Sequence, residues 1–481
     1  MLAALAIMMV ALAWMRPIDH DESQYVAAAV LSAHGLLPYR DYAYLQTPLQ
    51  PLLFAPIAWA AGDWAYPALR IVNALLGAAA VAGVYAAARV AGALTTIALA
   101  AAGLFAACDI LLFSAGTARN DALPAAMLAL SLPLMLKAER GDGSRAGAAI
   151  IGLLLAGAAA AKISYAVPAL AYGIYALARW RHRPLWLVAG TLPAVVLVGW
   201  TVAASPSGFL FGTLVFPSAA PAEYYRAADK AWKLGQAAKL LDTLKFLALG
   251  PALVSLGIVA MARRQRWPSL LDWLILAGLV SALLPTPTWR QYLLPVLPPL
   301  FVRLAQLWEG RSLGRWRIVL AVFAAAGLAP SVAAVATGGG LIAAGREGGA
   351  IRRALDSAGV IGGVATLSPE FLPATGRQVD PRFATGPFYF RSHGLLPATD
   401  ESRLHLIARD RLPEAFASEP PAAILVGGEG RWTSGDDVLD RVLEDWAVRH
   451  GWRGVTVESR HFRLYLPPQA AARRFPSSSS E

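Results

Sequence analysis

Long apolar runs separated by short polar connections fill the first 337 residues of the chain. About eleven of these runs approach the roughly 20 residues with which an α-helix crosses the hydrocarbon of a bilayer. We therefore expect a polytopic α-helical membrane domain over residues 1–337. The predicted spans lie near residues 1–15, 67–91, 94–113, 122–138, 146–162, 163–180, 185–204, 243–262, 270–288, 292–308 and 317–337.

The pattern changes after residue 337, where no apolar run is long enough to span a membrane. Helix-like segments now alternate with strand-like ones, which predicts a small C-terminal α/β domain over residues 338–481. Its tail, Ser477 to Ser480, is expected to be disordered. The predicted helices are 346–358 and 436–450, and the predicted strands are 360–367, 422–427, 454–458 and 462–466.

Composition agrees with a membrane protein, because 57% of the 481 residues are apolar and only 15% are charged. Soluble domains hold about a quarter charged residues, so a water-soluble enzyme, a disordered chain and a coiled coil are poor fits. Cys108 is the single cysteine and cannot form an intrachain disulfide. No Cys/His cluster offers a structural zinc site.

The net charge of +11 lies entirely in the membrane part, since residues 338–481 carry 17 Arg, no Lys and 17 acids. Basic clusters in alternate connections predict a cytoplasmic side and a cytoplasmic N-terminus, with the C-terminal domain outside the cytoplasm. This spacing indicates topology in a cell membrane and not a nucleic-acid surface. The clusters are Lys137/Arg140/Arg145, Arg179/Arg181/Arg183, Arg263/Arg264/Arg266 and Arg311/Arg315/Arg317.

The first outer loop, residues 16–66, has an organisation of its own. A segment from Asp21 to Ala33, ended by Gly35 and Pro38, reads as a short helix at the membrane interface. A second apolar stretch, 51–59, follows it. Another loop, 205–242, combines aromatic residues with lysines, which suits either contact with lipid headgroups or a solvated connector.

Acids are rare in the membrane part, yet Asp19, Asp21 and Glu22 lie within four positions at the outer end of the first span, followed by Asp41. Like charges beside lipid must share protons, pair with cations or hold a divalent metal. For Asp21 alone, a helix cap with Gln24 reaching back is the simpler alternative. That alternative does not explain three acids together.

Further charges are predicted at the same outer face. Asp121 lies where the third span returns as the fourth, and Asp109 is an acid within the third. Their simpler readings are a helix cap for Asp121 and pairing with a basic neighbour such as Arg119 for Asp109. Lys162 and Arg290 could bind an anion or extend to the headgroups. Together these groups suit transfer of a group from a lipid-linked phosphate.

The residues in this order resemble GT-C fold membrane glycosyltransferases. The segments that carry the resemblance are His20-Asp21-Glu22-Ser23-Gln24-Tyr25, Gly35 to Asp41, Pro48-Leu49, Asn120-Asp121, Lys162, and Arg290 with Tyr292 before Pro295 and Pro298. The branch is similar to bacterial relatives of the dolichyl-phosphate-mannose protein mannosyltransferases and to the lipid A aminoarabinose transferase. The resemblance covers about residues 1 to 310, and the C-terminal segment matches by position alone.

The resemblance implies transfer of a sugar from a polyprenyl-phosphate donor to an acceptor hydroxyl on the extracytoplasmic face, with inversion. Asp21 would be the general base, and Glu22 and Asp121 would shape the catalytic site. Asp19 lies two positions before Asp21, so which of the two acids is the base stays open.

The same resemblance implies a donor-binding group. Lys162 and Arg290 would neutralise the lipid phosphate and Tyr292 would hydrogen-bond it. Asp41 would lie near that phosphate, alone or through a divalent metal such as Mg or Mn, although the adjacent Arg40 argues against the metal. No other cofactor is expected. Asp19, Tyr39 and Arg40 complete the predicted substrate-binding residues.

Two other classes of function remain. One is a lipid or solute transporter or flippase with carboxylate-coupled transport, against which the sequence offers no inverted repeat and no pair of broken helices in matching halves. The other is a scaffold for a cell-envelope assembly, which leaves the buried acids unexplained. The expected partners are the lipid-linked donor, membrane lipids and a glycan, lipid or protein acceptor. No nucleic acid is expected.

Overall fold

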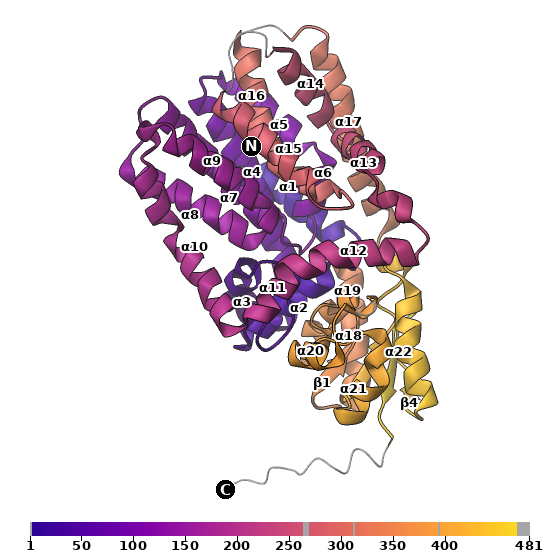
Figure 1. The fold of residues 1–481 in the computed structure, drawn as a ribbon. Coiled ribbons are helices and arrows are strands. Elements are labelled where there is room, and N and C mark those ends of the chain that lie inside the picture. The colour runs from indigo at the N-terminus through magenta and orange to yellow at the C-terminus, as the bar shows by residue number, and fades with distance from the viewer. Residues whose placement is uncertain (1, 263–268, 311–312, 393–394, 469–481) are drawn as a thin grey trace. The chain divides into compact units, whose positions relative to one another are not determined.

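The computed structural model describes residues 2–262, 269–310, 313–392 and 395–468 (Figure 1). Its contacts divide the chain into two compact units. The first unit runs to Arg16 and includes Leu45–Gln50 and Arg70–Gly338. The second unit comprises Pro17–Tyr44, Pro51–Leu69 and the chain from Gly339 onward. Most of the first outer loop, which the sequence groups with the membrane helices, therefore folds in the second unit.

Apolar helices dominate the first unit. Among the described residues, four helical stretches are long and apolar enough to cross a membrane, or six if each of two bent helix pairs counts as one span. The other predicted spans are also helical but shorter. The four long stretches are Leu49–Val90, Ala122–Glu139, Pro184–Ala204 and Trp316–Ser357, and the shorter apolar helices include Ala3–Met15, Arg145–Ala161, Ile163–Leu177 and Leu270–Leu283.

The predicted connector 205–242 is itself helical. Two of its segments, α11 and α12, are joined by the single-turn π-helix η4. The helices that lie wholly or mainly in the first unit are α1 (Leu2–Met15), α4 (Ala65–Val90), α5 (Thr95–Ala106), α6 (Asp109–Ala115), α7 (Ala122–Glu139), α8 (Arg145–Ala161), η2 (Ile163–Tyr165), α9 (Ala166–Leu177), η3 (Trp180–His182), α10 (Pro184–Ala204), α11 (Pro206–Leu210), η4 (Phe211–Val215), α12 (Phe216–Ala227), η5 (Ala231–Leu234), α13 (Gln236–Ala248), α14 (Ala252–Ala262), α15 (Leu270–Leu283), η7 (Arg290–Val296), α16 (Leu297–Gly310) and α17 (Trp316–Thr337).

Two predicted single spans are broken. Helices α5 and α6 meet at 69°, and α13 and α14 meet at 101°. The breaks contact each other, because the Asp109 N–H donates to the Leu249 carbonyl at 3.1 Å. A Cβ at Gly250, where φ is +132°, would lie 2.9 Å from the Cys108 Cα, so glycine is required there. The structure therefore contains broken helices that the apolar runs of the sequence did not reveal.

Small residues allow neighbouring helices to approach closely. A Cβ on Gly152 of α8 would lie 2.0 Å from the Leu187 carbonyl oxygen of α10, and one on Gly190 would lie 1.9 Å from the Ala149 carbonyl oxygen. Backbone contact of this kind is typical of helices packed within a membrane, where small side chains replace a hydrophobic driving force. Figure 1 shows α8 lying beside α10.

A five-stranded sheet forms the centre of the C-terminal part of the second unit. Its strand order is β2 (Gln378–Val379), β1 (Gly363–Ala365), β3 (Ala423–Val426), β5 (Arg463–Leu466) and β4 (Arg453–Val455). Strand β1 pairs in parallel with β2 and β3, and β5 pairs antiparallel with β3 and β4. The central strand β3 is buried throughout. Helix α22 packs against β3 and buries Leu443 and Trp446, beside Phe416 of α21, in the core of this unit.

Every helix and strand predicted after residue 338 has a counterpart in the structure. The predicted helix 346–358 begins earlier, at Leu341. Among the strands, only β2 was not predicted, because two residues carry no detectable alternation. The short helices between residues 369 and 433 were not predicted either. The elements that lie wholly or mainly in this unit are α2 (Glu22–Ala33), α3 (Leu49–Ala61), η1 (Gly62–Trp64), α18 (Leu341–Ser357), β1 (Gly363–Ala365), η8 (Pro369–Phe371), η9 (Pro373–Thr375), β2 (Gln378–Val379), η10 (Pro381–Phe383), α19 (Pro387–Phe390), α20 (Ala398–Arg403), η11 (Arg409–Arg411), α21 (Leu412–Ser418), β3 (Ala423–Val426), η12 (Arg431–Thr433), α22 (Asp437–Arg449), β4 (Arg453–Val455) and β5 (Arg463–Leu466).

Some sequence-based predictions fall outside the described residues. These are the basic residues Arg263, Arg264, Arg266 and Arg311 and the predicted disordered tail Ser477 to Ser480.

Candidate functional site

Charged side chains gather around the ring of Phe113 in the first unit, and we call this group the Phe113 cluster. It draws on five separate segments of the chain, so tertiary packing assembles it. Its members are Arg16, Asp109, Phe113, Arg119, Asp121, Lys162, Arg290 and Tyr292.

Asp121 holds one side of this cluster together. It precedes α7 and is 1% exposed, and its carboxylate pairs with Arg119 at 3.1 Å and with the Lys162 ammonium. The Lys162 Nζ also lies 5.3 Å from the centre of the Tyr292 ring, which is favourable for a cation. Lys162 is buried, so the alternative that it extends to the headgroups is wrong. Asp121 makes no capping hydrogen bond, so the cap alternative is wrong too.

Arg290 forms the other side of the cluster. Its Nη1 lies 2.9 Å from Asp109 Oδ2, and its guanidinium lies 3.4 Å from the centre of the Phe113 ring. Asp109 therefore pairs with a basic residue, as its simpler reading expects, but the partner is Arg290 and not Arg119. The guanidiniums of Arg16 and Arg119 lie 5.2 and 5.3 Å from the same ring. One aromatic side chain thus contacts three arginines.

Amide side chains fix the turn that carries Arg119 and Asp121. Asn73 of α4 donates to the carbonyls of Thr117 and Arg119 at 2.7 and 2.6 Å. Asn120 donates to the Ala161 carbonyl at 3.2 Å, which ties this turn to the residue before Lys162. Buried turns need such partners because their backbone carbonyls have no water.

Several cations lie together in the Phe113 cluster. Arg16, Arg119, Lys162 and Arg290 are grouped with the carboxylates Asp109 and Asp121. Side-chain exposure is greatest at Arg290, at 27%, against about 5% for Arg119 and Lys162. Oriented cations around a partly exposed arginine favour an anion such as a phosphate group.

A second constellation lies in the second unit, where the chain turns into α2. The Asp19 carboxylate accepts from the Asp21 N–H at 3.0 Å, and the Glu22 carboxylate accepts from the Asp19 N–H at 3.0 Å and the Tyr66 hydroxyl at 2.8 Å. Glu22 is fully buried, whereas Asp21 is 26% exposed. Asp21 makes no capping hydrogen bond to α2, so the alternative of a helix cap with Gln24 is wrong.

His20 lies between two carboxylates. Its Nε2 is 3.2 Å from Asp21 Oδ1, and its Nδ1 is 3.0 Å from Glu429 Oε1. The His20 backbone N–H also donates to the Thr433 carbonyl at 2.8 Å. The C-terminal part of the chain therefore orients the histidine beside Asp21.

The loop that carries Glu429 is held by Asp440 of α22. The Asp440 Oδ2 accepts from the N–H groups of Gly427 and Glu429 at 2.7 and 2.8 Å. Burial raises the pKa of this carboxyl to about 7, and the nearby Glu429 acts in the same direction. Asp440 is thus a titratable residue that holds the Glu429 loop in place.

Three further predicted residues surround the turn after α2. Tyr39 has a φ of +69° and a buried ring, which leaves its side chain no access to a substrate in this structure. Arg40 is exposed and donates to both oxygens of Asp41, at 2.9 and 2.7 Å, while the Leu37 N–H donates to Asp41 Oδ2 at 2.8 Å. The Arg40 guanidinium holds the pKa of Asp41 below its usual range.

This arrangement does not fit the metal role predicted for Asp41, because Arg40 and a backbone N–H already engage both carboxylate oxygens. Within the described part of the chain, no group of three His, Cys, Asp or Glu side chains is placed to hold a metal ion.

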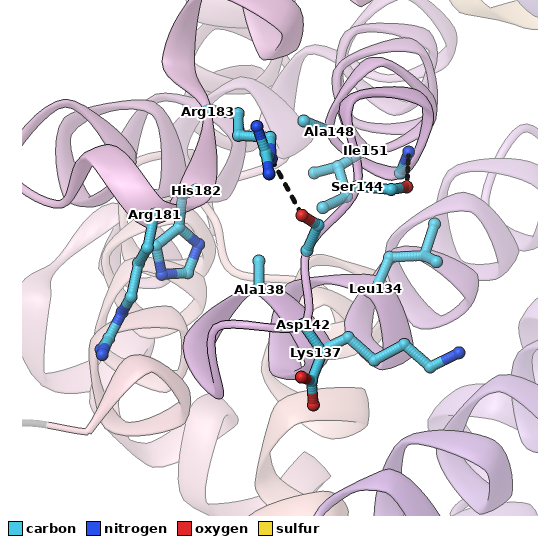
Figure 2. A pocket seen from close by; sticks show the side chains of 12 residues that line it. Leu134, Lys137, Ala138, Asp142, Ser144, Ala148, Ile151, Arg181, His182 and Arg183 are labelled. Atoms are coloured by element: carbon cyan, nitrogen blue, oxygen red, sulfur yellow. Dashed lines mark hydrogen bonds between the residues drawn. The ribbon is translucent and has the colours of Figure 1, made fainter.

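A basic cavity of about 150 Å³ lies elsewhere in the first unit, between the end of α7, the start of α8 and η3. Figure 2 shows that the cations of this cavity point in different directions. Arg183 donates to the Gly143 carbonyl, and the side chains of Lys137 and Arg181 extend away from Arg183. The cavity therefore has no convergent charge for a substrate.

The structure brings the predicted residues together in separate groups. Asp121, Lys162, Arg290 and Tyr292 join the Phe113 cluster, Asp19, Asp21 and Glu22 form the turn before α2, and Tyr39, Arg40 and Asp41 form the turn after it. Sequence reasoning gave no role to Arg16, Phe113 or Glu429. Arg16 ends the first apolar run, which is a usable signal, but nothing local marks Phe113 or Glu429.

Comparisons with known proteins test the fold. No family model and no curated protein matches the sequence. The structure is similar to ArnT from Cupriavidus metallidurans bound to undecaprenyl phosphate, with a TM-score of 0.62, 15% identity and 98% of each chain covered. This chain has the GT-C fold.

Two other solved structures agree with this assignment. For the apo state of the same ArnT the TM-score is 0.59 and the identity 16%, over 97% of this chain and 98% of that one. For the Archaeoglobus fulgidus oligosaccharyltransferase in complex with Zn and sulfate the TM-score is 0.50 and the identity 15%, over 92% of this chain and 70% of that one. The GT-C fold that the sequence predicts is thus confirmed.

We expect the stability of the protein to fall as pH rises from about 4 to about 7, in part through Asp440. Its pKa of about 7 in the folded state exceeds the ordinary aspartate value of about 3.9, so the folded state holds the proton over this window and the unfolded state does not. Thermal unfolding in detergent, followed at several pH values, measures this slope.

Asp440→Asn should make that slope shallower, because asparagine can accept the same two N–H bonds without ionising. Asp437→Asn, an exposed position on the same helix, is the control and should leave the slope unchanged. Equal slopes in the wild type and Asp440→Asn would contradict the role of Asp440.

Proposed function

We propose that this chain is an integral membrane glycosyltransferase. It transfers a sugar from a polyprenyl-phosphate donor to an acceptor hydroxyl on the extracytoplasmic face of the cell membrane, with inversion. The observation that supports the proposal is the convergence of Lys162 and Arg290, each held by a buried carboxylate, in the Phe113 cluster of a fold shared with an ArnT structure bound to undecaprenyl phosphate. The N-terminus is cytoplasmic and the residues after 338 form an extracytoplasmic α/β domain.

The Phe113 cluster binds the phosphate of the donor. As the bond between the anomeric carbon and the phosphate oxygen breaks, its electron pair stays on the phosphate, whose negative charge increases. Arg290 and Lys162 stabilise that charge, and they are already oriented by Asp109 and Asp121, so they need little reorganisation during the reaction. Tyr292 lines the same group beside Lys162.

Asp21 is the general base. It accepts the proton of the acceptor hydroxyl while the oxygen forms a bond to the anomeric carbon, opposite the departing phosphate, which inverts that carbon. Asp21 is favoured over Asp19 because the Asp19 carboxylate holds the Asp21 backbone and Asp21 itself faces His20. Fully buried Glu22 stabilises the turn through Tyr66.

His20 positions Asp21. Its Nε2 lies 3.2 Å from Asp21 Oδ1, and Glu429 fixes the orientation of the ring through Nδ1 at 3.0 Å. The histidine therefore holds the Asp21 carboxylate in place for the acceptor hydroxyl.

A transporter remains the second candidate, because the first unit contains two bent helix pairs, at 69° and 101°. Flux of a lipid-linked sugar across sealed vesicles without any covalent product would favour it over a transferase.

Asp21→Asn should lower kcat by a factor of about 10² to 10⁴, the range attributed to general base catalysis. Asp19→Asn, two positions away, is the matched comparison and should have a smaller effect. The assay follows labelled sugar from a polyprenyl-phosphate donor to a hydroxyl acceptor in proteoliposomes. Undiminished transfer by Asp21→Asn would exclude Asp21 as the base.

Glu429→Gln should lower kcat with little change in KM and should shift the pH dependence of kcat, because it removes the charge that faces His20 Nδ1. Glu419→Gln, an exposed acid outside this group, is the control. A parallel loss of folded protein, with no change in the pH profile of what remains, would give Glu429 a structural role only.

Arg290→Gln should weaken the binding of undecaprenyl phosphate at least tenfold, since it removes the most exposed cation of the Phe113 cluster. Arg303→Gln is the matched control, because Arg303 forms a similar pair with a buried acid, Asp272, at 3.1 Å. Titration calorimetry in detergent measures the binding of undecaprenyl phosphate to both variants. Undecaprenol serves as the uncharged control ligand. Equal weakening in the two variants would contradict a phosphate site at Arg290.

A further inference from the structure

A cavity of about 230 Å³ lies within the second unit. Its walls come from η1 and the start of α4, from α18, and from the segment that begins with η8. The side chains and glycine that matter for its chemistry are Trp64, Tyr66, Gly345, Arg352, Glu370 and Phe371. The proposed transfer reaction assigns no role to this cavity.

Glu370 is the unusual member of the lining. Its side chain is 1% exposed, and neither carboxylate oxygen has a hydrogen-bond partner among the described residues. Burial raises the pKa of Glu370 well above its usual range, and Glu429, Glu22 and Asp440 act in the same direction. A protonated carboxyl offers one donor and free acceptor positions, and buried polar groups normally have partners.

Aromatic side chains form the apolar part of the cavity. The Phe371 ring is buried and held by Phe462 and Trp432, with ring centres 4.9 and 5.6 Å away. Trp64 is 66% exposed. These rings supply a rigid surface and an accessible one for an apolar face of a ligand.

Further polar groups and an open position complete the cavity. Arg352 Nη1 donates to Asp63 Oδ2 at 2.6 Å, and both side chains are exposed. On the same helix, a Cβ at Gly345 would meet no atom within 4 Å, so α18 leaves space there. The cavity thus combines a buried carboxyl, an exposed ion pair and aromatic walls.

We propose that this cavity binds a sugar ring. The hydroxyls of the ring would hydrogen-bond Glu370 and the Arg352 and Asp63 pair, and one face of the ring would lie against the aromatic side chains. A ligand of this kind satisfies Glu370 without changing its charge.

Two other ligand classes fit less well. An acyl chain would fill the apolar part and leave Glu370 without a partner. A primary ammonium group would require Glu370 to ionise in the field of Glu22, Glu429 and Asp440. The proposal rests on the geometry of the second unit alone, and sugar binding can be measured without any transfer reaction.

The test is saturation-transfer NMR on the full-length protein with methyl glucoside, methyl mannoside and methyl galactoside as probes. The protein is kept in a detergent without sugar headgroups, because a glycosidic detergent would compete. At least one glycoside should bind the wild type, and Gly345→Leu, which fills the cavity, should abolish that binding. Gly173→Leu is the matched control, because a Cβ at this helical glycine in the first unit also meets no atom within 4 Å.

Glu370→Ala should weaken glycoside binding at least tenfold, and Glu370→Gln, which restores hydrogen-bonding atoms, should weaken it less. Thermal unfolding of each variant checks that it is folded, and the Glu370 pair decides the question if Gly345→Leu does not fold. The proposal is overturned if no glycoside binds, if binding survives both Gly345→Leu and Glu370→Ala, or if butylammonium binds in place of the glycosides.

Discussion

The arrangement of the first unit depends on the pairing of Asp121 with two buried cations. An isolated charge in a low-dielectric interior is strongly unfavourable, so Arg119 and Lys162 can be buried only with a carboxylate between them. Removing one partner of such a group costs about 3–5 kcal/mol, because the other charges are left uncompensated. The pairing also joins the turn before α7 to the end of α8, and Asn73 and Asn120 reinforce that junction.

The charges of the Phe113 cluster stabilise the fold and also suit the binding of an anion. The ring of Phe113 contacts the guanidiniums of Arg16, Arg119 and Arg290, while Asp109 and Asp121 hold Arg290 and Lys162 in fixed positions. Cations held in this way favour an anion.

In the second unit, residues near the two ends of the chain build one hydrogen-bonded group. His20 receives its orientation from Thr433 and Glu429, and Asp440 holds the loop that carries Glu429. The GT-C fold is retained at 15% identity to ArnT. The proposed function therefore depends on a small number of charged residues and not on extended sequence similarity.

The sequence by itself determined what local patterns record. Hydrophobic run length predicted the helical membrane fold, and alternation after residue 338 predicted four of the five strands. Rare acids and cations in apolar surroundings identified Asp21, Asp121, Lys162 and Arg290 as candidates, since such residues are retained in lipid only for a reason.

Only the tertiary structure decided how these residues pair. Asp109 meets Arg290 and not Arg119, and His20 meets an acid 409 positions away. The helix breaks at Cys108 and Gly250 were not predicted, because they depend on the close contact between these two residues. Periodicity reports the faces of single elements, whereas contacts between distant elements depend on packing, and no local sequence signal encodes that packing.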